Sequence, residues 1–160
     1  MERDLETGLE REIHGVGAPS LYEGGMDLSP DGQQLAFVVR EEESQSNVLK
    51  VVPVAGGPAR DVLRETPPLM RRKVVWAPDG RSLLFARRIR PHDSYDAKAE
   101  LWLISAEGGE PRKLDLAAEG MNDLCIHPDG RHVAYTSGGT KVEIWALENF
   151  LPPAEATVAR

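Results

Sequence analysis

The sequence has a single cysteine in 160 residues, and this scarcity excludes a disulfide bond within the chain. Nothing near Cys125 in the sequence indicates an activated thiolate, so we expect it to be a small buried hydrophobic residue of an inner strand. No apolar run is long enough to span a bilayer. Residues 1–4 also lack the basic start and the apolar stretch of a secretory signal peptide.

Basic residues are fewer than acidic ones, with 19 lysines and arginines against 26 aspartates and glutamates, so the formal net charge is −7. This balance gives no support for nucleic acid or an anionic membrane as the main partner. Apolar residues make up 41% and charged residues 28% of the chain. Such a composition is typical of a soluble globular protein and argues against disorder.

What the sequence does contain is a turn motif that occurs three times. Pro-Asp-Gly lies at residues 30–32, 78–80 and 128–130, so its aspartates are 48 and 50 residues apart. Proline sets φ for the first turn position, aspartate tolerates the next, and glycine supplies the positive φ that closes a bulged hairpin. The predicted turn residues are Pro30, Asp31, Gly32, Pro78, Asp79, Gly80, Pro128, Asp129 and Gly130. A period near 50 residues is typical of β-propeller blades.

The residues on both sides of each motif predict strands. Apolar side chains recur at every second position, as in Met26 and Leu28 before the first turn and Leu35 and Phe37 after it. A second turn follows each hairpin, at Gly56-Gly57 and at Gly108-Gly109, and Thr7-Gly8 resembles it near the start of the chain. Each repeat therefore predicts four short antiparallel strands, which make one propeller blade.

These repeats resemble the WD-like repeats of TolB-type β-propellers, which are marked by Ser-Pro-Asp-Gly. Residues 29–32 carry the full motif, whereas Ala77 and His127 replace the serine in the other two copies. Residues 141–152 are similar to the final strand of such propellers in bacterial multidomain proteins. The resemblance covers about residues 3–152 and implies an all-β propeller. TolB itself is periplasmic, so the missing signal peptide leaves a cytoplasmic protein, or a periplasmic one whose N-terminus is truncated.

We therefore predict an all-β fold with three four-stranded antiparallel blades, half or a fragment of a roughly six-bladed TolB-like propeller. We expect residues 1–150 to form the propeller and residues 151–160 to form a C-terminal tail. The propeller would contain an outer strand in 1–14, blades at about 23–64 and 72–116, and an incomplete blade at 121–147. This makes twelve strands, and natural propellers have about four to eight blades. The chain is then a fragment of a longer propeller, or two copies associate so that strand 9–14 of one completes the last blade of the other.

The sequence offers little catalytic or metal-binding chemistry. It has no Gly-x-Ser-x-Gly nucleophile elbow. The histidines have no zinc-ligand spacing, and we expect His127 to be a structural residue beside its turn. Asp27 and Asp123, on or near inner strands, are two carboxylates without further ligands, which makes a poor metal site. We predict no catalytic residue, no cofactor and no bound metal.

The longest predicted loops join the second and third strands of the first two blades, at residues 41–46 and 88–96. In a propeller these loops share one face, here called the loop face, with the connector at 64–73. Binding residues tend to lie on long loops of a rigid scaffold. The candidates for partner binding are Arg71, Arg72, Lys73, Arg88, Arg90, His92 and Tyr95, beside the acidic residues 41–43. The alternative is a solvated charged rim.

The function that these patterns favour is a non-catalytic scaffold that mediates protein–protein interaction, with the C-terminal part of a larger bacterial multidomain protein as one form of it. Its expected partners are one or more proteins, with a second copy as the candidate that closes the ring, and neither nucleic acid nor membrane. The competing hypothesis is a substrate-gating or sensor propeller of an enzyme. That enzyme would be a prolyl-oligopeptidase-type peptidase, a kinase or a regulator whose catalytic domain is absent from these residues.

Overall fold

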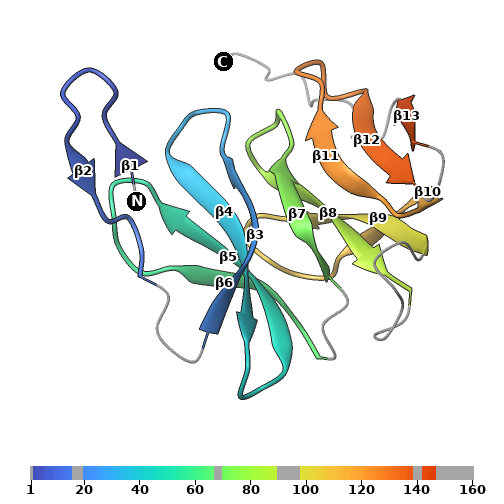
Figure 1. Ribbon diagram of the computed structural model, residues 1–160, viewed down its shortest axis with the longest axis horizontal. Helices are drawn as coiled ribbons and strands as arrows, with labels where there is room; N and C mark the ends of the chain where they lie inside the picture. Colours follow the sequence, from blue (N-terminus) through green and yellow to red (C-terminus); the bar gives the residue numbers. More distant parts are fainter. Residues whose placement is uncertain (1, 16–19, 67–69, 90–97, 139–141, 147–160) are drawn as a thin grey trace, which may run out of the picture.

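The computed structural model describes residues 2–15, 20–66, 70–89, 98–138 and 142–146, and every regular element among them is a strand (Figure 1). Two sheets have four strands and one has three, and all strand pairs are antiparallel. The predicted all-β class with antiparallel sheets is therefore confirmed. The described residues contain no helix long and apolar enough to cross a membrane.

Each sheet is a meander of neighbouring strands. The first sheet consists of β3 (Ser20–Leu28), β4 (Gln34–Glu41), β5 (Ser46–Pro53) and β6 (Arg60–Glu65). The second sheet consists of β7 (Met70–Trp76), β8 (Ser82–Arg88), β9 (Lys98–Ser105) and β10 (Arg112–Glu119). The third sheet consists of β11 (Asn122–Ile126), β12 (Val133–Gly138) and β13 (Val142–Ala146). The sheets follow one another in chain order, and β7 packs against both β3 and β11, the first strands of its neighbours (Figure 1).

The Pro-Asp-Gly turns join the first two strands of each sheet. Their glycines have φ values of +71°, +64° and +69°, in the left-handed region that a side chain rarely adopts. The aspartate carboxylate of each turn accepts the backbone N–H two residues later, as Asp79 does from Arg81 at 2.8 Å. The turn conformation is therefore fixed by its own residues.

The hydrophobic core lies between the sheets, because both faces of the second sheet are covered. Leu83 and Phe85 of β8 pack against the first sheet, whereas Leu84 and Ala86 pack against the third. All four side chains are at most 2% exposed. The two-residue period of a strand thus delivers alternate side chains to two separate cores.

The first residues of the chain differ from the single expected outer strand. They form a hairpin of two short strands, β1 (Glu2–Arg3) and β2 (Glu10–Arg11), so the described residues contain thirteen strands rather than twelve. The Asp4 carboxylate accepts the backbone N–H groups of Glu6 and Thr7 at 2.8 and 2.7 Å, which folds the chain back on itself. This local turn gives β2 a partner within the hairpin.

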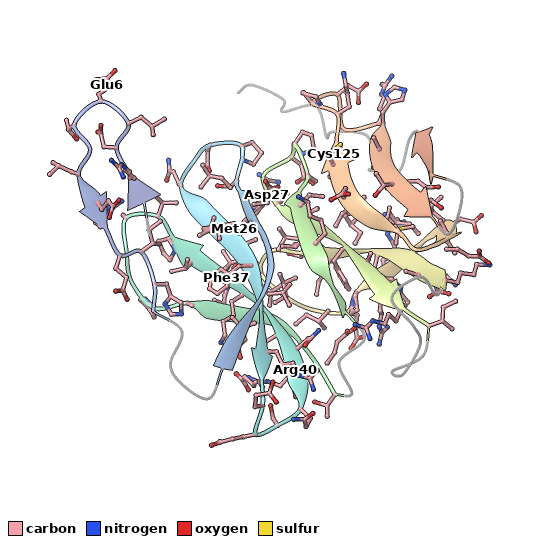
Figure 2. The ribbon with its side chains drawn as sticks, in the orientation of Figure 1. Glu6, Met26, Asp27, Phe37, Arg40 and Cys125 are labelled. Atoms are coloured by element: carbon pink, nitrogen blue, oxygen red, sulfur yellow. The ribbon has the colours of Figure 1, made fainter. Side chains whose placement is uncertain are left out.

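Cys125 is exposed, so the expectation that it would be buried is wrong. It lies on β11 between Leu124 and Ile126, which pack against the second sheet (Figure 2). Successive side chains of a strand point to opposite faces. Cys125 therefore points to the far face of the third sheet, where none of the described strands covers it.

Candidate functional site

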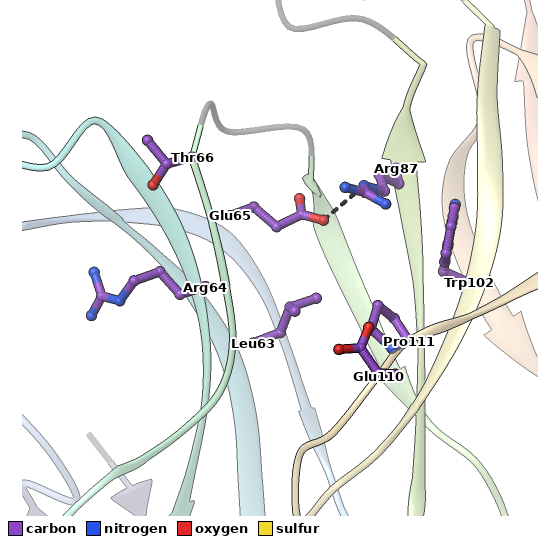
Figure 3. Close-up of a pocket in the computed structure, with 8 residues that line it drawn as sticks. All are labelled: Leu63, Arg64, Glu65, Thr66, Arg87, Trp102, Glu110 and Pro111. Carbon is purple, nitrogen blue, oxygen red and sulfur yellow. Dashed lines mark ion pairs between the residues drawn. The ribbon is translucent and has the colours of Figure 1, made fainter.

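A pocket of about 420 Å³ lies between the first and second sheets (Figure 3). It is formed by the last residues of β6, the end of β8, the middle of β9 and the segment that leads into β10. Its lining residues are Leu63, Arg64, Glu65, Thr66, Arg87, Trp102, Glu110 and Pro111. Because β6 and β8 both end at the loop face, the pocket reaches the face on which binding residues were predicted.

An ion pair crosses the pocket from one sheet to the other. Arg87 Nε lies 2.7 Å from Glu65 Oε1, and the Glu65 side chain is only 5% exposed (Figure 3). The guanidinium carbon of Arg87 also lies 4.8 Å from the centre of the Trp102 ring, in a cation–π contact. Burial strengthens such contacts, since less water screens them. The pair therefore holds the two sheets together at the loop face.

Trp102 lines the pocket with its aromatic ring. Its indole Nε1 is buried and has no hydrogen-bond partner among the described residues. A buried donor usually finds a partner, because leaving it unpaired costs free energy. The surface that the pocket offers to a partner is therefore an aromatic ring beside a paired charge.

The rim beside the pocket consists of acidic and basic side chains whose charges are paired with one another. Arg64 donates to the Glu41 carboxylate and, at 3.0 Å, to Asp61. The hydrogen bond from Arg64 lowers the pKa of Glu41, and the same bond raises the pKa of Arg64. Glu42 lies 3.5 Å from Arg40. The predicted acidic patch at 41–43 is thus largely balanced by arginines of its own sheet.

The predicted binding residues are only partly covered by the structure. Lys73 and Arg88 are half-buried, on β7 and at the end of β8. Arg88 Nε is buried without a hydrogen-bond partner among the described residues. Arg71 and Arg72 lie on β7, but their side chains are outside the described part of the chain. Arg90, His92 and Tyr95 lie outside the described residues altogether.

Three of the pocket residues, Glu65, Arg87 and Trp102, were not among the binding residues predicted from the sequence. Each occupies an ordinary position in a predicted strand, and no local motif marks it. The signal that was available is charge inside strands: β6 and β8 both end in charged residues next to alternating apolar ones. Such residues must find partners where the next sheet covers them.

The third Pro-Asp-Gly turn brings two predicted structural residues together with a histidine. Asp129 Oδ2 lies 3.1 Å from His127 Nδ1 and 2.6 Å from His132 Nδ1. The backbone N–H of Arg131 lowers the pKa of Asp129, with further help from the two histidines. Asp27 and Asp123 are not joined in any such group: Asp27 accepts the Trp76 backbone N–H at 2.7 Å, and Asp123 accepts the Thr136 hydroxyl at 3.1 Å.

Comparison with known proteins places the fold. No family model matches the sequence. The chain is 26% identical over 145 residues to an uncharacterized peptidase, YuxL, of Bacillus subtilis, a match that covers 72% of this chain and 22% of the relative. The solved structures that are similar in fold include the following two. TolB of Acinetobacter baumannii has a TM-score of 0.69 and 15% identity, and the match covers 91% of this chain and 34% of TolB.

The second structure is the β-propeller domain of the Trilobed protease of Pyrococcus furiosus, with a TM-score of 0.57 and 18% identity. That match covers 79% of this chain and 38% of the other. The chain thus spans between a fifth and two fifths of the lengths of these proteins. At this level of identity the likeness establishes a TolB-like propeller fold.

Proposed function

We propose that the chain is a non-catalytic propeller scaffold that binds a protein partner through the loop face of its first two sheets. The observation that supports this most is the pocket, where the buried Glu65–Arg87 pair and the Trp102 ring lie between two rigid sheets. Aromatic and arginine side chains are enriched where protein partners bind most tightly. The predicted basic residues are close in sequence to the pocket residues Glu65 and Arg87, and we expect them to steer an acidic partner toward the pocket.

The basic residues of the loop face give a direct test. Replacing Arg72, Arg88 and Arg90 with alanine should abolish capture of an acidic partner, because rim charges steer association. Exposed rim charges contribute roughly 0–1 kcal/mol each to folding, and the half-buried Arg88 is the position at which a larger loss of stability is expected. The measurement is a pull-down followed by a thermal melt of the variant.

A matched control replaces three arginines far from the loop face, Arg3, Arg81 and Arg131, with alanine, which changes the net charge by the same amount. This control should retain the partner. If the loop-face variant keeps every partner of the wild type, the loop face is a solvated charged rim and the proposal is wrong.

A second candidate function is the propeller part of a peptidase, and the similarity to YuxL favours it. In that case the present residues would gate access of substrates to a catalytic domain that lies outside them. Incubation with chromogenic esters and peptides separates an active chain from a scaffold: turnover by the purified 160-residue chain would contradict the non-catalytic proposal.

The outer face of the first sheet supports a further part of the proposal, that two copies of the chain associate. Met26 and Leu28 on this face are 54% and 50% exposed (Figure 2). Counted from the turn aspartates, their equivalents in the second sheet are Val74 and Trp76, which are at most 4% exposed because the first sheet covers them. The repeat therefore indicates that the outer face of the first sheet is built to be covered by another sheet.

The third sheet of a second copy is the cover that we propose. The far face of the third sheet carries the exposed Cys125, and β13 is an edge strand of this sheet among the described residues. An open edge invites a strand from another chain. We propose that residues 9–14 of one copy add to β13 of its partner, as a two-fold arrangement allows. The alternative cover is a further sheet of a longer chain.

Light scattering on the purified chain should then report twice the monomer mass of 17.6 kDa. Replacing Met26 and Leu28 with glutamate should yield a monomer, because two charges cannot be buried against an apolar sheet without a large cost. Ile89→Glu is the control, since Ile89 is 46% exposed but lies next to the loop face. A stable, well-dispersed wild-type monomer would contradict association of two copies.

A further inference from the structure

We propose that the third Pro-Asp-Gly turn binds a divalent transition-metal ion through His127, Asp129 and His132. One ligand atom from each residue lies within 4.8 Å of the other two. The side chains are 63%, 34% and 41% exposed, so a hydrated ion can reach them from solvent. This site is independent of the proposed partner-binding face, because the turn lies at the opposite end of its hairpin.

Two hydrogen-bond acceptors face each other in the turn, His127 Nδ1 and the Asp129 carboxylate, and this arrangement favours a cation between them. In the neutral tautomer that carries its proton on Nε2, His127 Nδ1 accepts the backbone N–H of Asp129 at 3.2 Å. The same nitrogen lies only 3.1 Å from the Asp129 carboxylate, which is also an acceptor. Two acceptors at this distance repel each other unless a proton or a metal ion lies between them. A metal ion can satisfy both of them and the backbone bond can rearrange around it.

The two other Pro-Asp-Gly turns show how the same geometry is satisfied without a metal. Ser29 donates its hydroxyl proton to Asp31 at 2.6 Å, from the position that His127 occupies in the third turn. Ser82 donates its hydroxyl proton to Asp79 at 2.8 Å, from the position of His132. The third turn therefore carries imidazoles at both positions where its sister turns use a serine donor.

The burial of the turns explains why histidine fits only in the third. Ser29 is 4% exposed and Ala77, its equivalent in the second turn, is 0% exposed. A larger imidazole at either position would have to displace the atoms that cover it. His127 is open to solvent because it belongs to the last of the three described sheets.

The donor set decides the class of metal. Two imidazole nitrogens and one carboxylate oxygen suit Zn²⁺, Co²⁺, Ni²⁺ or Cu²⁺, whereas Ca²⁺ and Mg²⁺ prefer oxygen ligands. Three protein ligands leave at least one coordination position for water or for a group of a bound partner.

The test is calorimetric titration of the untagged, chelator-treated chain with ZnCl₂. The wild type should bind one equivalent. His127→Ser and His132→Ser should each weaken binding at least tenfold, and the double variant should abolish it. Serine occupies these positions in the sister turns, so the variants should keep the melting temperature of the wild type. Visible absorption of the Co²⁺-loaded protein provides a second readout, because tetrahedral Co²⁺ bound to histidine has characteristic intense bands.

His14→Gln is the matched control, since His14 packs against Phe37 in the first sheet and is far from this turn in the sequence. It should bind one equivalent with the affinity of the wild type. The proposal is overturned if the wild type binds no Zn²⁺, or if the double serine variant binds as tightly as the wild type.

Discussion

Replacing Gly120 with alanine is expected to lower the free energy of unfolding by roughly 2–5 kcal/mol, the sum of a strained backbone and an overpacked contact. Gly120 connects the second and third sheets and has a φ of +56°. A Cβ atom at this position would lie 2.2 Å from the carbonyl oxygen of Gly138. That oxygen belongs to the backbone of β12, so it cannot move aside without disturbing the third sheet. Urea unfolding of the variant measures the loss.

Gly80→Ala is the matched control for this prediction. Gly80 has a similar φ of +64°, but a Cβ atom there would meet nothing within 4 Å. It should therefore cost only the backbone strain, about 1–2 kcal/mol. Equal losses for the two variants would show that the close approach of Gly120 to β12 contributes nothing.

Replacing Arg87 with methionine is expected to cost about 3 kcal/mol, at the lower end of the range for breaking a buried ion pair because Arg87 is 27% exposed. The methionine keeps the packing of the arginine stem, but it removes the cation from a carboxylate that is 5% exposed. It also removes the contact with the Trp102 ring. Thermal or denaturant unfolding gives the loss.

Two further variants isolate the charge effect. Glu65→Gln combined with Arg87→Met should be more stable than Arg87→Met alone, because no charge is then left buried without its partner. Lys113→Met removes the cation of an exposed pair with Glu100 on neighbouring strands and should cost less than about 1 kcal/mol. An Arg87→Met variant as stable as Lys113→Met would contradict the structural role of the pocket pair.

The strands and turns were predictable because their causes are local. Alternating apolar residues such as Leu83 and Phe85 specify one face of a strand whatever surrounds it. The carboxylate of Asp79 fixes its turn through backbone groups two and three residues away. These features need no knowledge of the neighbouring sheets.

Most features that the sequence did not predict depend on contacts between distant residues. Cys125 is exposed because burial of that face requires a sheet beyond the third, which alternation along β11 cannot reveal. Glu65 and Arg87 meet across two sheets, and no local rule pairs them. The histidines at 127 and 132 lack the spacing of familiar zinc motifs, yet the fold of the turn brings them to one carboxylate. The sequence alone therefore predicted where the strands and loops lie but not the pocket between the sheets.

The most direct test of the proposed scaffold function is site-specific photo-crosslinking in a lysate of cells that express the protein. A photoreactive residue at position 66 replaces Thr66, which is exposed and lines the pocket on the loop face. The same residue at position 81 replaces Arg81, exposed beside the Pro-Asp-Gly turn at the other end of β8. We expect a specific protein adduct from position 66 and none from position 81. Adducts from position 81 alone, or from neither position, would contradict binding through the loop face.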